Sequence, residues 1–514
     1  MMFTKKWLAP ATIAATMTLS AIPALSLQAE AKNPTVQKVD YKTPLQATET
    51  YNYFITQQPN LYNVDTVIAF ARSNYPVAKN YYDNYYKLVE KEAMETKGAF
   101  ASLTAGAFAK QIIAVSAMGK DPRNVAGYNL IDTLGDKMLV EKNKNSTGVS
   151  NYIYAIIALE SKSYNYSDSD KYAAVSHKSL VDHLASTQFD NGGFSWDSKS
   201  ANGVSEDMTA MALIALANYT ADAQIKASVR DGFDYIQTKL TKDAGYAPWG
   251  GNSADSQAQV IFALTENGWN PKTASDFIKP QGNWAISNIL LNFDKNTGGF
   301  FVKPGDHEPN NYTTYSGFAG LVAYDRYATE RATFFDTSDA TTTNLKFDTV
   351  APKTVKMAAV TNTAKTVTGI AEPYAQATIY IASKKVATLT ANATGKFTYT
   401  LPTSLNAKES VKVYITDLAG NKSKAFSYTV IDKLTPATPK ASTVKAGATS
   451  VKGTATKGLK VYAKIASKTY SATASKTTGK FTIKVPKQKA STKITLYTKL
   501  GNYTSKKVVV TVKK

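Results

Sequence analysis

A short apolar signature centred on alanine recurs six times between residues 40 and 335. The central alanines are separated by 48, 41, 57, 48 and 60 residues. A period of about 40 to 60 residues is typical of a helical hairpin that must stack on its neighbours to bury its apolar side. The six copies therefore predict six stacked hairpins. The central residues are Ala69, Ala117, Ala158, Ala215, Ala263 and Ala323.

The segments that carry the signature differ from the segments between them. Residues 208–216 are apolar on nearly every side, as a helix surrounded by other helices requires, whereas residues 172–184 and 225–240 are amphipathic. Alternating buried and half-exposed helices suit an inner ring inside an outer ring. We therefore expect an all-α (α/α)6 toroid over residues 32–338. An open superhelix of the same hairpins is the alternative that the periodicity leaves open.

Glycine turns followed by an aromatic residue precede three of the inner segments, at residues 188–196, 243–246 and 296–300. Here the chain resembles the prenyltransferase and squalene-cyclase repeat superfamily, and the resemblance implies a closed α/α toroid. Residues 205–210 and 254–259 resemble the toroid domains of exported bacterial proteins and of transcobalamin-like vitamin carriers.

Neither enzymatic chemistry of that superfamily is expected to carry over. Protein prenyltransferases use a cysteine among their zinc ligands, and this chain has no cysteine. Cyclases of the squalene-hopene type use an Asp-x-Asp-Asp motif, whereas the nearest string here, residues 168–171, ends in Lys171. We expect no metal site, no cofactor and no membrane insertion.

A candidate site follows from the direction of the inner helices. Alternating hairpins make these helices parallel, so their N-termini, with their partial positive charges, gather at one mouth. Asp65, Glu206, Asp207 and Asp255 stand at or just before inner-helix starts. An acid there is usually an N-cap or a first-turn charge that satisfies free backbone N–H groups, but one cap does not require both Glu206 and Asp207. The residues expected to contact a small molecule or glycan are Phe194, Trp196, Glu206, Asp207, Asp255, Phe300 and Tyr312.

Carbohydrate lyase or hydrolase activity is the enzymatic alternative, because such chemistry uses acid pairs, or tyrosine with histidine or arginine. Its candidate catalytic residues are Glu206, Asp207, Asp255 and His307. His307 follows a glycine-containing loop at the expected mouth. We expect the other two histidines, His177 and His183, to be ordinary surface residues of an outer helix, away from the mouth.

After residue 335 the pattern changes to short alternating strands, as at residues 378–382 and 411–416. The string Thr-Gly-Lys-Phe at residues 394–397 returns 84 residues later, at residues 478–481. This repeat predicts two small β-sandwiches. We expect a linker over residues 339–350 and Ig-like domains over residues 351–432 and 433–514, the first of which resembles the bacterial Ig-like modules of surface proteins.

Lysine accumulates toward the C-terminus. Residues 433–514 contain 19 lysines and no acidic residue, and such a surface attracts polyanions. Nucleic acid is disfavoured, because residues 351–514 contain no arginine and few aromatics alternate with the lysines. We expect an anionic cell-wall polymer as the partner. The candidate contacts are Lys452, Lys457, Lys460, Lys464, Lys484, Lys487 and Lys489.

The N-terminus has the pattern of an export signal. Lys5 and Lys6 precede an apolar stretch over residues 7–25, and residues 29–31 supply the small-x-small pattern of a cleavage site. Prolines and hydroxyl residues interrupt the stretch, which argues against a membrane anchor. We expect a signal peptide over residues 1–31 and a mature protein in the cell wall or at the cell surface.

These observations together predict an exported, cell-wall-associated binding protein. The toroid mouth would hold a small molecule or glycan, and the basic Ig-like domains would attach to the wall polymer. The alternatives are the carbohydrate-active enzyme and a non-catalytic surface adhesin or spacer.

Overall fold

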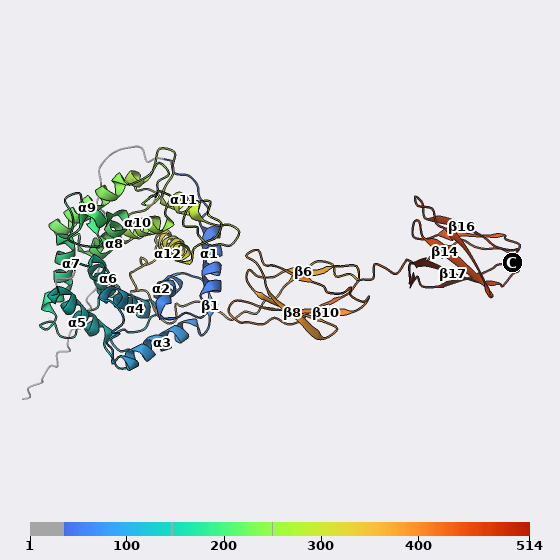
Figure 1. Cartoon of the computed structure of the whole chain (residues 1–514), viewed down its shortest axis with the longest axis horizontal. Helices are drawn as coiled ribbons and strands as arrows, with labels where there is room; N and C mark the ends of the chain where they lie inside the picture. The colour runs from blue at the N-terminus through green and yellow to red at the C-terminus, as the bar shows by residue number, and fades with distance from the viewer. Residues whose placement is uncertain (1–34, 145–146, 249) are drawn as a thin grey trace, which may run out of the picture. The chain divides into compact units, whose positions relative to one another are not determined.

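The computed structural model describes residues 35–144, 147–248 and 250–514 (Figure 1). The expected signal peptide, residues 1–31, lies outside these described residues. The described chain has a helical N-terminal half and a β-rich C-terminal half, as the sequence predicts. Within the described ranges, no helix combines the length and the apolar character needed to cross a membrane.

The described residues of the N-terminal half form twelve α-helices, and all six alanine signatures fall in the even-numbered ones. Short 3-10 turns connect several of them. The helices are α1 (Lys42–Ile55), α2 (Val64–Arg72), α3 (Tyr81–Glu95), α4 (Ala105–Ala117), α5 (Leu130–Asn143), α6 (Val149–Glu160), α7 (His177–Ser186), α8 (Glu206–Leu216), α9 (Ala223–Thr238), α10 (Ala254–Glu266), α11 (Ala285–Ile289) and α12 (Asn311–Ala328).

Contacts divide the chain into two compact units whose limits differ from the expected domain limits. Helices α1 and α2 and most of α3 group with the β-rich half. In the same unit, β1 (Val77–Ala78) pairs in parallel with β4 (Phe347–Asp348), which lies inside the expected linker. The described residues of the first unit are 35–41, 91–144, 147–248, 250–293 and 300–341, and those of the second are 42–90, 294–299 and 342–514.

In the first unit, α4, α6, α8, α10 and α12 pack against one another in chain order. Their side chains are largely buried, and α5, α7 and α9 pack on the outside of this row (Figure 1). The alternation of inner and outer helices expected from the sequence is therefore present in this unit. Closure of the row into a six-hairpin ring stays a prediction.

A glycine turn recurs in the helical half, before α8, α10, α11 and α12. The backbone N–H of Phe189 donates to the carbonyl of Gly193 at 3.0 Å, and equivalent bonds close the turns at residues 241–245, 279–283 and 294–299. Gly192 has a φ of +81°, and a Cβ at this position would lie 2.3 Å from the carbonyl oxygen of Asp231. Only glycine meets both requirements. The turn at residues 279–283 was not among the three identified from the sequence.

The C-terminal half contains two antiparallel β-sandwiches. In each, side chains from both sheets share one apolar core. One sheet of the first sandwich has the strand order β5 (Lys356–Met357), β6 (Thr366–Ile370), β9 (Lys396–Thr400). The other sheet has the order β11 (Phe426–Thr429), β10 (Ser410–Thr416), β7 (Gln376–Ile381), β8 (Lys384–Thr390). One sheet of the second sandwich has the strand order β12 (Lys440–Ala441), β13 (Ser450–Thr454), β16 (Lys480–Lys484). The other sheet has the order β15 (Lys468–Thr473), β14 (Lys460–Ile465), β17 (Lys493–Leu500), β18 (Tyr503–Thr504), and β19 (Val508–Thr511) also pairs with β17.

The 84-residue repeat corresponds to one packing arrangement used twice. Gly369 on β6 lies directly opposite Phe397 on β9, and Gly453 on β13 lies opposite Phe481 on β16. A Cβ on either glycine would come within 2.7 Å of the facing ring. Each glycine therefore leaves the space that the buried phenylalanine of its sandwich occupies.

We predict that Gly453→Ala destabilises the second sandwich by about 1–3 kcal/mol, because the added methyl group overlaps Phe481 and the carbonyl of Lys440. Hydrogen exchange of β13 and β16 in the full chain measures the effect as faster amide exchange. Thr482→Ala, on the exposed face of β16, should change the opening free energy by less than about 0.5 kcal/mol. Equal exchange rates in the two variants would contradict the packing argument.

Candidate functional site

Three inner helices of the first unit, α8, α10 and α12, begin with serine or asparagine caps. Ser205 accepts a hydrogen bond from the backbone N–H of Met208 at 3.2 Å, and Ser253 accepts one from Ser256 at 3.1 Å. Asn310 caps α12 in the same way. The acids at the starts of α8 and α10 are therefore not N-caps; Glu206, Asp207 and Asp255 lie in the first helical turn, where the helix dipole favours a negative charge.

These three acids lie at the start of two neighbouring helices, α8 and α10, that pack together. Glu206 is 7% exposed. Asp207 and Asp255 each have one enclosed carboxylate oxygen, Oδ1, without a hydrogen-bond partner among the described residues. The other oxygen of Asp255 accepts a hydrogen bond from the hydroxyl of Thr313 at 3.0 Å. The structure thus brings together the carboxylates that the sequence singled out.

Burial raises the pKa of Asp207 to about 6. The Ser256 hydroxyl opposes this rise, and the negative charges of Glu206 and Asp255 add to it. A carboxyl group that titrates close to neutral pH can act as a hydrogen-bond donor as well as an acceptor, which suits recognition of hydroxyl groups or proton transfer. Within the described ranges, no group of three or more histidine and acidic side chains is arranged to hold a metal ion.

The four predicted aromatic contacts fall into two classes. Phe194 and Phe300 are fully buried, and their backbone N–H groups donate to the hydroxyls of Thr209 and Thr314 at 2.9 and 2.8 Å. They therefore belong to the core and fix each turn against the next inner helix, with no surface for a ligand. Trp196 and Tyr312 are 62% and 69% exposed, so a large part of each side chain faces solvent. Asp65 lies in the first turn of α2, in the second unit.

One of the three histidines, His177, departs from expectation. His307 lies in an exposed loop, whereas His177, expected at an ordinary surface position, is half-buried at the start of α7. Its Nδ1 lies 2.7 Å from Oε1 of Glu160 and its Nε2 lies 2.8 Å from the carbonyl oxygen of Tyr164. Since both neighbours are acceptors, they favour the ring that carries two protons and a positive charge. This environment of His177 could not be predicted from the sequence, because Glu160 and Tyr164 come from another helix and a loop.

The pKa values of the pair follow from this geometry. The hydrogen bond to Glu160 raises the pKa of His177. The pKa of Glu160 is lowered by hydrogen bonds from His177 and Tyr219, although burial opposes the change. His183 packs its ring on Tyr152 at 4.1 Å, and burial lowers its pKa.

We predict that the stabilisation supplied by His177 depends on pH. Because its folded pKa lies above the unfolded value of about 6.5, the contribution is complete below that pH and is lost as pH rises through the folded pKa. The lowered pKa of Glu160 sets the other limit, since its contribution is lost as pH falls through that value. Thermal unfolding of the wild type and of His177→Gln from pH 4 to 9 should show a difference that is largest between these limits.

His183→Gln is the matched control on the same helix. Its lowered pKa gives the opposite sign, so the contribution of His183 should grow as pH rises through about 6.5. A wild-type advantage over His177→Gln that increases above pH 7 would contradict the assignment of a charged His177.

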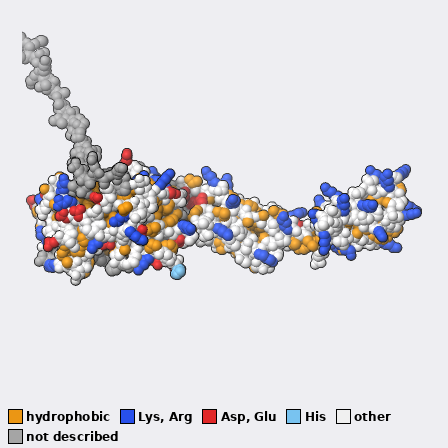
Figure 2. Space-filling model, turned by 90° about the horizontal axis from the view of Figure 1, so that it is seen from above, with side chains coloured by type: hydrophobic (Ala, Val, Ile, Leu, Met, Phe, Trp, Pro, Cys, Tyr) orange, Lys and Arg blue, Asp and Glu red, His pale blue; other side chains and the backbone are white. Residues whose placement is uncertain are grey.

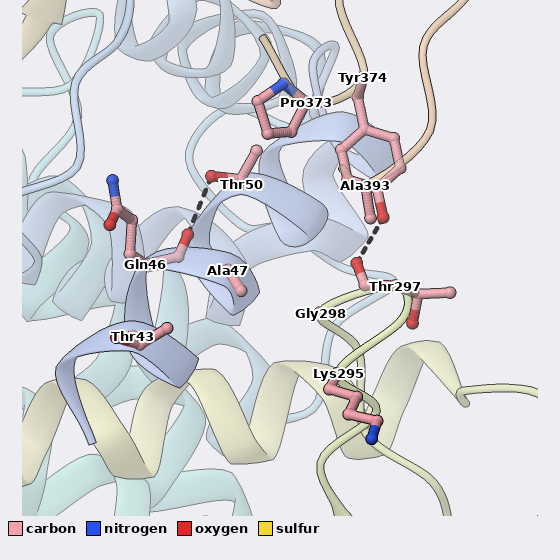
Figure 3. A pocket seen from close by; sticks show the side chains of 10 residues that line it. All are labelled: Thr43, Gln46, Ala47, Thr50, Lys295, Thr297, Gly298, Pro373, Tyr374 and Ala393. Carbon is pink, nitrogen blue, oxygen red and sulfur yellow. Dashed lines mark hydrogen bonds between the residues drawn. The ribbon is translucent and has the colours of Figure 1, made fainter. Parts of the chain in front are cut away.

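A cavity of about 320 Å³ lies within the second unit (Figure 3). Tyr374 forms part of its wall, with its ring stacked on Phe54 at 4.4 Å and its hydroxyl donating to the carbonyl of Thr297. The cavity is at the small end of the range for ligand sites. The sequence did not predict it, because its walls come from three remote segments. It is lined by Thr43, Gln46, Ala47, Thr50, Lys295, Thr297, Gly298, Pro373, Tyr374 and Ala393.

All 19 lysines of residues 433–514 are exposed, and many of them are visible on the second sandwich in Figure 2. The seven predicted wall contacts do not form one patch. Lys452 and Lys484 are on the outer face of the β12–β13–β16 sheet, whereas Lys460 and Lys464 are on the outer face of the β14–β17 sheet. Lys457, Lys487 and Lys489 lie in loops.

Comparison with known proteins identifies one family in this chain. Residues 351–432 match the bacterial Ig domain family, at the limits expected for the first sandwich. No curated protein matches the chain.

Three similar solved structures each match about a third of the chain. A biofilm-associated protein (BSP domain) is 18% identical over 32% of this chain, a 1.5-MDa bacterial ice-binding adhesin is 13% identical over 29%, and a two-domain fibronectin type III segment of chicken tenascin is 12% identical over 32%. The TM-score is 0.16 in each case. The matches cover 29%, 56% and 100% of those chains, so this chain spans less than two thirds of the first two.

Proposed function

We propose that this chain is an extracellular, wall-associated binding protein. In this proposal the second sandwich attaches to an anionic wall polymer, and the helical half closes into an α/α toroid whose mouth holds a small molecule or glycan. The bacterial Ig domain at residues 351–432 supports a surface-associated protein.

The observation that carries the attachment is the one-sided charge of residues 433–514. Their lysines are all exposed and no acidic side chain offsets them, whereas ordinary protein surfaces mix both signs. A domain of this kind repels itself and gains free energy when a polyanion replaces its counterions. An anionic wall polymer is the partner that fits an extracellular location.

The mouth of the helical half is supported by three features. The inner helices of the first unit pack in series, Asp207 and Asp255 each have one enclosed carboxylate oxygen without a hydrogen-bond partner among the described residues, and Trp196 and Tyr312 are exposed. Aromatic rings beside carboxylates are typical of sites that bind sugars and other hydroxyl-rich molecules.

A carbohydrate lyase or hydrolase is the second candidate. The raised pKa of Asp207 favours it, because a carboxyl group that titrates near neutral pH is suited to general acid–base catalysis. Formation of a product from a glycan by the wild type, lost in Asp207→Asn, would select this function over simple binding.

We predict that the full chain binds isolated Gram-positive walls at low salt and is released as the salt concentration rises toward about 1 M, where the screening length falls to about 3 Å. Sedimentation of wall-bound protein across a salt series measures this. Walls from which the anionic polymers have been extracted should retain little protein. Retention at 1 M salt, or equal binding to extracted walls, would contradict electrostatic attachment.

We predict that Asp207→Asn abolishes ligand binding while stabilising the helical half at pH 7 by about 1–2 kcal/mol. The stabilisation arises because the pKa of Asp207 is raised in the folded state. The wild-type protein therefore loses free energy of unfolding as pH rises from about 4 through 6, and asparagine removes this loss. A thermal-shift panel of glycans and metabolites measures both effects.

Asp190→Asn, at an exposed position of the preceding turn, is the control and should bind like the wild type. A helical half that unfolds in Asp207→Asn, or binding that survives the substitution, would reject the mouth as the site.

A further inference from the structure

The outer face of the β14–β17 sheet carries an ordered set of charged and aromatic side chains. Alternate residues Val461 and Ala463 of β14 are buried, so Lys460, Tyr462 and Lys464 point away from the core. On β17, Ile494, Leu496 and Thr498 are buried, so residues 493, 495, 497 and 499 point outward. The strand register places Lys460 opposite Lys499, Tyr462 opposite Tyr497 and Lys464 opposite Thr495.

The Lys460–Lys499 pair is unfavourable in the isolated chain. Like charges directly opposite each other on neighbouring strands destabilise a sheet, and residues 433–514 contain no acid to separate them. Their ammonium groups lie over tyrosine rings instead: both nitrogens are 5.8 Å from the centre of the Tyr462 ring, and that of Lys499 is 6.0 Å from the centre of the Tyr497 ring. Cation–π contacts at such distances hold the two charges in place.

The two tyrosines form a stack beside the lysine pair. Their ring centres are 5.1 Å apart and their planes are inclined by 9°. Both tyrosines are partly exposed on this face, and the strand register places their stack between the Lys460–Lys499 pair and Lys464. Along β14 the two charged positions are four residues apart, which is about 14 Å.

The first sandwich provides an internal comparison at the same register. There the corresponding cross-strand pairs are Gln376–Thr416, Thr378–Tyr414 and Tyr380–Lys412. The first of these pairs is uncharged and the second has a single tyrosine. The paired lysines and stacked tyrosines are therefore a property of the second sandwich and do not follow from the shared fold.

The opposite face of the second sandwich is basic in a different way. On β12–β13–β16 each lysine is opposite a hydroxyl residue: Lys440 and Lys480 flank Thr454, Lys452 faces Thr482 and Lys484 faces Ser450. None of these three strands places an aromatic residue on this outer face. The outer face of β12–β13–β16 is therefore positively charged without aromatic rings, whereas the outer face of β14–β17 combines paired lysines with stacked tyrosines.

We propose that the outer face of β14–β17 is the polymer-binding site of the second sandwich, and that its ligand is a chain of polyol units joined by phosphate groups. A phosphate between Lys460 and Lys499 removes their mutual repulsion. The polyol unit beside it meets the tyrosine edges and hydroxyls, and a later phosphate meets Lys464. This inference rests on the proposed attachment to a wall polymer and assigns its site and ligand class.

The experiment compares two double variants of the full chain that lose the same charge. Lys460→Gln/Lys499→Gln removes the paired lysines, and Lys452→Gln/Lys484→Gln removes two exposed lysines from the opposite face. Binding to immobilised poly(glycerol phosphate) is measured at several salt concentrations. We expect the first variant to bind about tenfold more weakly than the second at physiological salt, with the second close to the wild type.

Lys499→Glu provides a readout of the unfavourable pair. An opposite-charge pair with Lys460 should raise the thermal stability of the second sandwich while it weakens polymer binding. A substitution that merely damaged the fold would lower both quantities.

The possible outcomes separate the two levels of the proposal. Equal losses in the two double variants would overturn the assignment of the face and leave attachment by general charge. Failure of the wild type to bind both poly(glycerol phosphate) and isolated walls would overturn the attachment itself. Binding of duplex DNA or of anionic lipid vesicles as tight as that of poly(glycerol phosphate), and equally sensitive to the paired lysines, would overturn the ligand class.

Discussion

An apolar helix is stable in water only when other helices cover it, and this requirement organises the N-terminal half. Helices such as α6 and α8 are apolar on nearly all sides, and each packs between two other inner helices of the same kind. Packing in series places successive helix starts side by side. The serine caps then satisfy the free backbone N–H groups, and Asp207 and Asp255 are left with carboxylate oxygens that the fold does not use. The chemistry of the candidate mouth is thus a consequence of how the core is covered.

The sequence predicted features that depend on local spacing. The alanine signatures correctly located the inner helices, and the 84-residue repeat correctly located the two sandwiches, because both patterns record which residues must be buried. Phe194 and Phe300 were wrongly predicted to contact a ligand. An aromatic residue after a glycine turn is common in ligand sites, and only the fold shows that these two rings are enclosed.

Features that join remote segments of the chain could not be predicted from the sequence. The charged His177 depends on Glu160 and Tyr164, which lie on the preceding hairpin, and the cavity beside Tyr374 has three separate walls. The opposition of Lys460 and Lys499 depends on strand register, since a shift of one residue would place one of them in the core. The count of lysines was visible in the sequence, whereas their pairing was not.

The two sandwiches share a glycine–phenylalanine pair at the same place in their cores, yet their outer faces differ. Stability in such a module is held by the inward residues of each strand, which leaves the outward residues free to change. A second copy can therefore acquire a new partner without a new scaffold, because every outward position already has a fixed neighbour across the sheet. The repeated module can thus keep its fold through the inward residues while the outward residues change the surface that a partner contacts.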